Sequence, residues 1–174
     1  KIRIITLFWQ LKKGGIIKSG FIQRAEDYIR KTALIIKGDT VLLSLSAGKD
    51  SMALYHVMRS LAPELGIRLA VFHLNHCVRG TESYADEAFL KDLCARDSVP
   101  AVFDRHDFSE EIAGFEEKAR DVRYTRIRAA MTELGCSRTA TAHTMSDQAE
   151  TVLMRECTGT HIRGLEGISP KRAH

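Results

Sequence analysis

The stretch SLSAGKDS, residues 44–51, ends an apolar run and leads into a segment with helical spacing. The run itself, TVLLSLS at residues 40–46, is continuous and rich in β-forming residues, which predicts a buried strand. Beyond the stretch, apolar residues recur at i, i+3, i+4 and i+7, which predicts a helix; they are Leu54, Val57, Met58 and Leu61. A glycine-containing turn between a buried strand and a helix is typical of loops that hold phosphate.

Known loop types can be tested against this stretch. A Walker A loop, GxxxxGK[ST], would need glycine where Leu43 stands and Ser or Thr where Asp50 stands. A nucleophile elbow, GxSxG, would need glycine in place of Ser44, and the dinucleotide fingerprint GxGxxG is absent. The alternatives left open are a phosphate loop of another type, in which Asp50 is a magnesium ligand, and a plain turn in which Ser and Asp cap a helix.

Strand-like and helix-like segments alternate from Gly20 onward. This order predicts an α/β fold, a parallel sheet with helices on both faces. The expected further strands are 67–74, 99–104 and 138–142, and the expected helices are 21–36, one after a capping Thr81, 113–134 and 145–157. Within them we expect apolar faces formed by Ala25, Ile29 and Ala33 in the first helix and by Ala85, Phe89 and Leu93 in the helix after Thr81.

Bulk properties fit one soluble domain. The 174 residues are 44% hydrophobic and 28% charged, and the net charge of +4 permits a nucleic-acid partner without requiring one. The four cysteines include no CxxC pair, and no apolar run is long enough to span a membrane, so we expect reduced thiols and a cytoplasmic protein. Residues 1–19 are expected to be an irregular extension and residues 20–174 the folded domain.

Two further polar clusters follow predicted strands, and ligands of such sheets bind beyond the carboxyl ends of the strands. HLNHCVRG, residues 73–80, is either a wall of a nucleotide pocket or an ordinary polar loop. In TAHTMSDQAET, residues 141–151, His143, Asp147 and Glu150 lie at i, i+4 and i+7 and share one helix face. They either hold a metal or nucleotide or form a solvated face.

Taken in order, five blocks of the sequence resemble the tRNA(Ile)-lysidine synthetase family, which belongs to the N-type ATP pyrophosphatases with a PP-loop, SGGxDS. The resemblance covers about residues 20–170. The blocks are FIQRAEDYIRK, GDTVLLSLSAGKDSMAL, HLNHCVRGTESYADEAFLKDLC, FEEKARDVRYTRIR and ATAHTMSDQAETVLMRECTGTHIRGLEGI. The last block is the most specific, because the PP-loop alone indicates only the superfamily.

The resemblance implies a ligase that adenylates C2 of the wobble cytidine of tRNA(Ile) with a CAU anticodon, releasing pyrophosphate, and then joins free L-lysine with loss of AMP. It implies ATP and Mg²⁺ as cofactors and a possible homodimer, with C-terminal tRNA-binding domains that this chain lacks. By position, Asp50 and Asp147 would bind the metal. The implied catalytic residues are Asp50, His143, Asp147, Glu150 and Arg120, and the implied nucleotide-binding residues are Ser46, Ala47, Gly48, Lys49, Asp50, Ser51 and Arg123.

Several positions depart from the family pattern. Ala47 replaces a glycine, Thr144 a histidine and Ser146 an aspartate. These departures motivate one alternative, a nucleotide-binding domain without catalysis. Lys49 motivates another, a PP-loop enzyme that thiolates tRNA, although such enzymes typically use paired cysteines and this chain has no CxxC.

Overall fold

The computed structural model describes residues 3–6, 18–77, 80–107, 115–142 and 171–173. Within these ranges, side chains are described for residues 20–77, 80–107 and 121–142. The predicted helix at 145–157 and the residues His143, Asp147 and Glu150 lie outside the described residues.

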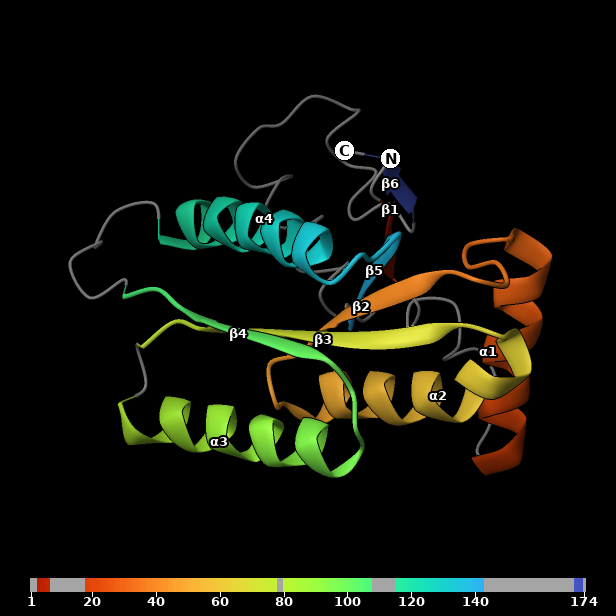
Figure 1. The fold of residues 1–174 in the computed structure, drawn as a ribbon, viewed down its shortest axis with the longest axis horizontal. Helices are drawn as coiled ribbons and strands as arrows, with labels where there is room; N and C mark the ends of the chain where they lie inside the picture. The colour runs from red at the N-terminus through yellow and green to blue at the C-terminus, as the bar shows by residue number, and fades with distance from the viewer. Residues whose placement is uncertain (1–2, 7–17, 78–79, 108–114, 143–170, 174) are drawn as a thin grey trace, which may run out of the picture.

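The centre of the structure is a six-stranded sheet with the order β4-β3-β2-β5-β1-β6 (Figure 1). Its strands are β1 (Arg3–Thr6), β2 (Thr40–Ser44), β3 (Arg68–Asn75), β4 (Ala101–Arg105), β5 (Arg138–Thr141) and β6 (Lys171–Ala173). The first five pair in parallel, and β6 runs antiparallel to β1 at the edge. The predicted parallel α/β sheet is therefore confirmed. The prediction of an irregular segment over residues 1–19 is wrong for residues 3–6, which pair with β5.

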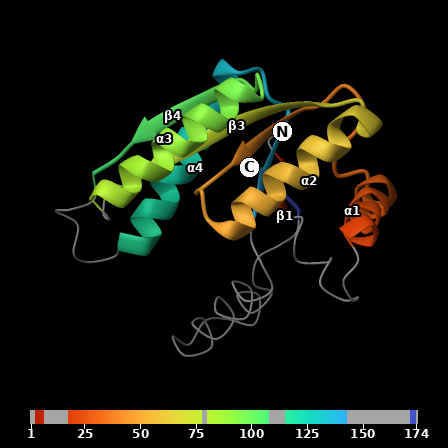
Figure 2. The same ribbon diagram turned by 90° about the horizontal axis from the view of Figure 1, so that it is seen from below.

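Helices cover both faces of this sheet, as the sequence predicts. They are α1 (Lys18–Thr32), α2 (Lys49–Leu65), α3 (Thr81–Arg96) and α4 (Phe115–Glu133). Figure 2 shows α2 and α3 side by side on one face with α4 behind the sheet, while α1 packs beside α2. Among the described residues, no helix combines the length and apolarity needed to cross a bilayer.

The interior of strand β2, residues 41–43, is apolar because both of its faces are covered. Val41, Leu42 and Leu43 are all fully buried. Since successive side chains of a strand point to opposite faces, Val41 and Leu43 join the core under α2, whereas Leu42 packs with Phe72 in the core under α4. A continuous apolar run is thus the expected pattern of a central strand in a parallel sheet.

Two details of the predicted helices are corrected. Helix α1 ends at Thr32, and Ala33 follows it with φ of 47°, outside the helix and exposed. In α3, Ala85 and Phe89 are exposed, and Phe89 is 50% accessible.

The buried face of α3 includes two polar residues, which apolar spacing alone could not reveal. It consists of Ser83, Glu87, Leu90, Leu93 and Cys94. The predicted cap is also displaced by one residue, because Thr81 is the first helical residue and Gly80 occupies the N-cap position without a side-chain cap bond.

The connections place a topological switch point at the carboxyl end of β2. The chain runs from β2 to β3 to β4 in one direction through α2 and α3, then returns through α4 to place β5 on the other side of β2. The two sets of connections therefore lie on opposite faces (Figure 2). In open parallel sheets, ligands bind at such a point, beyond the carboxyl ends of the strands.

Candidate phosphate-binding site

The segment between β2 and α2 leaves an open helix N-terminus at the switch point. Gly48 is the N-cap residue, and no side chain caps the helix there. Helix α2 is 17 residues long, so its dipole contributes partial positive charge at this end. Unpaired backbone N–H groups together with this charge suit the phosphate groups of a nucleotide.

Ser51 closes the loop on itself. Its side chain is 4% exposed, and its Oγ accepts from the amide of Ser46 at 3.2 Å and from Ser46 Oγ at 3.4 Å. The same hydroxyl donates to the carbonyl of Gly48 at 2.9 Å. Its proton is therefore used within the loop. Ser46 is exposed and retains free access to solvent at its side chain.

Ala47 adopts a left-handed conformation, with φ of 61°. This region is costly for a residue with a Cβ, which gives a physical reason for the glycine that the family pattern has here. The half-buried Ala47 packs against the core under α2. The core accommodates the methyl group of Ala47. The cost of having alanine in place of glycine is therefore strain in the loop backbone.

Gly48 is different, because its φ of −68° is open to any residue. An added Cβ would meet only Ser46 Oγ, at 3.5 Å, an ordinary contact. The protein environment therefore leaves room beside Gly48, as close approach of a ligand to the backbone requires.

Lys49 and Asp50 begin α2. Lys49 is exposed and Asp50 is half-buried in the first turn, where the helix dipole favours a carboxylate. The predicted second metal ligand, Asp147, lies outside the described residues. Within the ranges that the structure does describe, no three His, Cys, Asp or Glu side chains gather as a metal site would require.

The carboxyl end of β3 adjoins the loop and is polar and buried. His73 is 4% exposed, and its Nδ1 lies 2.8 Å from the carbonyl oxygen of Leu45. Asn75 is 2% exposed, and its amide donates to the Ser83 carbonyl at 3.1 Å and to Glu87 Oε2 at 3.0 Å. Its Oδ1 accepts from the amide of Cys77 at 2.9 Å. The buried side chain of Asn75, at the end of β3, thus holds the turn that follows this strand.

Glu87, which the sequence did not single out, is the centre of this polar network. It is 3% exposed and accepts from Lys91 at 2.7 Å and from Arg105 at 2.8 and 2.9 Å. Hydrogen bonds from Arg105, and then from Lys91 and Asn75, hold the pKa of the Glu87 carboxyl well below its usual range, although burial opposes them. The available signal was the i, i+4 spacing of Glu87 and Lys91, which more often marks a solvated face.

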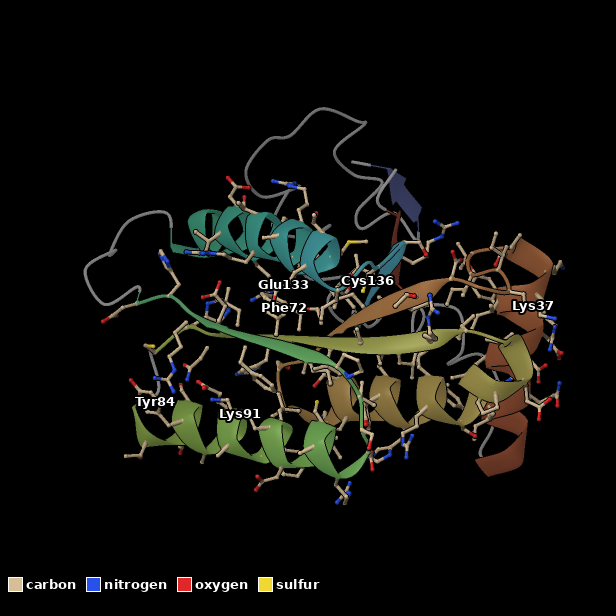
Figure 3. All side chains as sticks on the ribbon, viewed as in Figure 1. Lys37, Phe72, Tyr84, Lys91, Glu133 and Cys136 are labelled. Carbon is tan, nitrogen blue, oxygen red and sulfur yellow. The ribbon has the colours of Figure 1, made fainter. Side chains whose placement is uncertain are left out.

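Two of these cations also lie over aromatic rings. Lys91 Nζ is 5.4 Å from the ring centroid of Phe103, and Arg105 lies 5.1 Å over Tyr84. Figure 3 shows Tyr84 and Lys91 on α3, on the side of the helix that faces β4. The network therefore ties α3 to β4 at the edge of the sheet where the phosphate loop opens.

Helix α4 reaches the same edge from the other face. Arg123 Nη2 lies 3.0 Å from Nε2 of His76, in the segment after β3. Of the two predicted arginines, Arg123 thus contacts the segment after β3. Arg120 lies in α4, but its side chain is outside those described.

Comparison with known proteins agrees with this geometry. A family model described as a PP-loop domain matches residues 19–174. The sequence is 40% identical over 154 residues to a tRNA(Ile)-lysidine synthase of Symbiobacterium thermophilum, covering 87% of this chain and 32% of that protein. It is 37% identical over 150 residues to the enzyme of the same name from Clostridium perfringens, covering 84% of this chain and 32% of that protein.

Among solved structures, the chain is similar to a U34-tRNA thiolase from Methanococcus maripaludis, determined with its [4Fe-4S] cluster. The TM-score is 0.68 at 18% identity, covering 91% of this chain and 61% of the other, and this likeness shows the fold alone. The chain spans about a third of the length of the first two synthases. A switch-point loop with an uncapped helix and a family match over residues 19–174 lead to one conclusion: this chain belongs to the PP-loop domain family.

Proposed function

We propose that this chain is the ATP-using catalytic domain of a tRNA(Ile)-lysidine synthetase, spanning residues 20–174. The observation that carries the proposal is the uncapped N-terminus of α2 at the switch point, in a sequence 40% identical to a synthase of that name. Phosphate groups of ATP would bind the N–H groups that follow Gly48. The wobble cytidine of tRNA(Ile) would enter at the same edge of the sheet.

The proposed reaction has two steps. The C2 oxygen of the cytidine attacks the α-phosphate of ATP, and pyrophosphate leaves. The amine of free L-lysine then attacks C2, the C2–O bond breaks and AMP leaves. Both steps require alignment and neutralisation of phosphate charge more than covalent help from the protein. The loop residues Ser46, Gly48 and Lys49 would bind and orient the phosphates.

Asp50 is our proposed ligand for Mg²⁺, with Asp147 as the second. The half-buried carboxylate of Asp50 would repel a phosphate group bound at the N-terminus of α2, and a divalent cation held by Asp50 would remove this repulsion. The metal would neutralise the phosphate charge that develops at the α-phosphate. His143, Glu150 and Arg120 are proposed to line the reaction centre. A homodimer is proposed as the working form in the cytoplasm.

The test is mass analysis of tRNA(Ile) after incubation with ATP and lysine. We expect the modified nucleoside to gain the mass of lysine less one water, with one pyrophosphate released for each product. Asp50→Asn and Asp147→Asn should abolish pyrophosphate release while circular dichroism stays unchanged. Because this chain spans about a third of the relatives, the assay should include a longer form that extends as they do. ATP binding without any modified tRNA in that longer form would instead support a non-catalytic nucleotide-binding domain.

A further inference from the structure

We infer that His73 is a positioning residue that fixes the entry of the phosphate loop through its Nδ1–H. The inference rests on the proposed function, because it assumes that the loop binds ATP. It adds a residue that lies outside the loop, on the neighbouring strand, and that no expectation from the sequence placed in this role.

The starting point is how β2 leaves the sheet. The amide of Leu45 still donates to the Phe72 carbonyl of β3, at 2.9 Å. In a continuing parallel ladder, the carbonyl of Leu45 would next accept from a backbone amide of β3. It lies instead 2.8 Å from Nδ1 of His73. A side chain therefore replaces the ladder at the point where the loop begins.

The chemistry of this contact fixes the tautomer. A carbonyl oxygen can only accept, so Nδ1 of His73 must carry the proton. In the neutral ring, Nε2 is then an acceptor, and it is buried with no hydrogen-bond partner among the described residues. A buried acceptor without a partner is unfavourable. Hydrophobic residues would avoid this cost, so the histidine is best explained by the bond that its other nitrogen makes.

The position of the bond gives it a function in the site. Leu45 is 3% exposed and immediately precedes Ser46, whose amide is held by Ser51. The loop is therefore anchored at its first residues by His73 from β3 and by Ser51 from α2. Ala47, in its left-handed conformation, follows directly. Strain of this kind persists only where the surrounding structure holds it in place.

The sheet offers a matched control. Thr139, in β5 on the other side of β2, is fully buried, and its Oγ1 donates to the carbonyl of Leu42 at 3.0 Å. Like His73, it donates from a neighbouring strand to a backbone carbonyl, but its acceptor Leu42 lies in the middle of β2, whereas Leu45 lies just past the end of that strand. Thr139→Val should destabilise the fold without moving the loop.

The experiment compares three variants of the full chain with wild type. His73→Leu fills the space of the ring but removes the donor, whereas the amide nitrogen of His73→Asn stands where Nδ1 does. For each we would measure Tm, hydrogen exchange of the amides of residues 45–48, and ATP affinity by calorimetry. We expect His73→Leu to speed hydrogen exchange of the amides of residues 45–48. We also expect it to weaken the affinity for ATP by about tenfold.

His73→Asn should keep loop protection and ATP affinity even where its Tm falls, and Thr139→Val should lower Tm with both loop readouts unchanged. The inference is overturned if His73→Leu retains loop protection, or if His73→Asn is as impaired as His73→Leu. The hydrogen-exchange measurement needs no ATP and therefore tests the role of His73 by itself. A wild-type chain that binds no ATP would contradict the proposed function without affecting this test.

Discussion

Nη2 of Arg123 lies 3.0 Å from Nε2 of His76, a hydrogen bond that joins α4 to the segment after β3. A guanidinium group has no acceptor, so His76 Nε2 must accept, and the ring carries its proton on Nδ1. The bond connects a helix on one face of the sheet to the polar edge at which the phosphate loop opens. It is formed between residues 47 apart in the chain.

This pair should be coupled energetically. We expect Arg123→Ala and His76→Ala to be less destabilising together than the sum of the two, with an interaction of about 1 kcal/mol. Urea unfolding of the two single variants and the double variant measures it. Arg126→Ala, which removes an ion pair with Asp104, is the control and should combine additively with His76→Ala. Additivity of the first pair would show that the bond contributes nothing to stability.

Two alanines in the left-handed region should respond differently to glycine. Ala33 is exposed at the end of α1, so Ala33→Gly should stabilise the protein by about 1 kcal/mol through relief of backbone strain. Ala47→Gly should stabilise the protein less, because it also removes a methyl group that packs against the core. Thermal unfolding of both variants checks the order. A larger gain at Ala47 than at Ala33 would contradict the packing argument.

Glu87 should make stability depend on pH. Its pKa is lowered in the folded protein, first by the hydrogen bonds from Arg105, so its contribution is fully present above the unfolded pKa of about 4.3. That contribution is lost as pH falls below 4.3 toward the folded pKa. We expect Glu87→Gln to cost about 1–3 kcal/mol at neutral pH. The difference from wild type should shrink progressively in acid.

Urea unfolding of both proteins from pH 7 down to about pH 3 follows this trend, since 3 lies below the unfolded pKa. Asp86→Asn, on the same helix but only partly buried, serves as the comparison. A constant difference between wild type and Glu87→Gln across the range would mean that the carboxylate charge does not stabilise the fold.

The cysteines should differ in reactivity. Burial raises the pKa of the Cys94 thiol to about 11, and its side chain is 4% exposed. At pH 8 only about a thousandth of Cys94 is then thiolate, the form that reacts. Cys77 is half-buried in the segment after β3. We expect iodoacetamide to label Cys77 well before Cys94, as measured by peptide mass spectrometry. In urea the two should react at similar rates, and equal rates in the folded protein would be inconsistent with the burial of Cys94.

The central strands and the phosphate loop could be predicted because their signals are local. A continuous apolar run predicts β2, and the failure of the Walker pattern at Leu43 and Asp50 leaves a different phosphate loop. The adjacency of the polar clusters after β2 and β3 followed from the rule that parallel strands end at one edge. These predictions needed no knowledge of side-chain orientation.

The buried polar residues could not be predicted, because their partners are distant in the chain. Glu87 looks like a surface residue until Arg105, 18 residues later, is seen to neutralise it. The role of Ser51 also depends on loop geometry, since its hydroxyl turns inward to Gly48. The strand at residues 3–6 was missed because so short a segment becomes a strand only through pairing with β5.

The strand order has a consequence for biosynthesis. Because β2 lies between β3 and β5, its second neighbour is complete only when the ribosome has reached Thr141, a hundred residues after Val41. Until then one hydrogen-bonding edge of a strand with an apolar interior stays open, a state prone to association with other chains. β5, which forms one side of the switch point, is synthesised equally late. A nascent chain therefore cannot complete its phosphate site before both edges of β2 are paired.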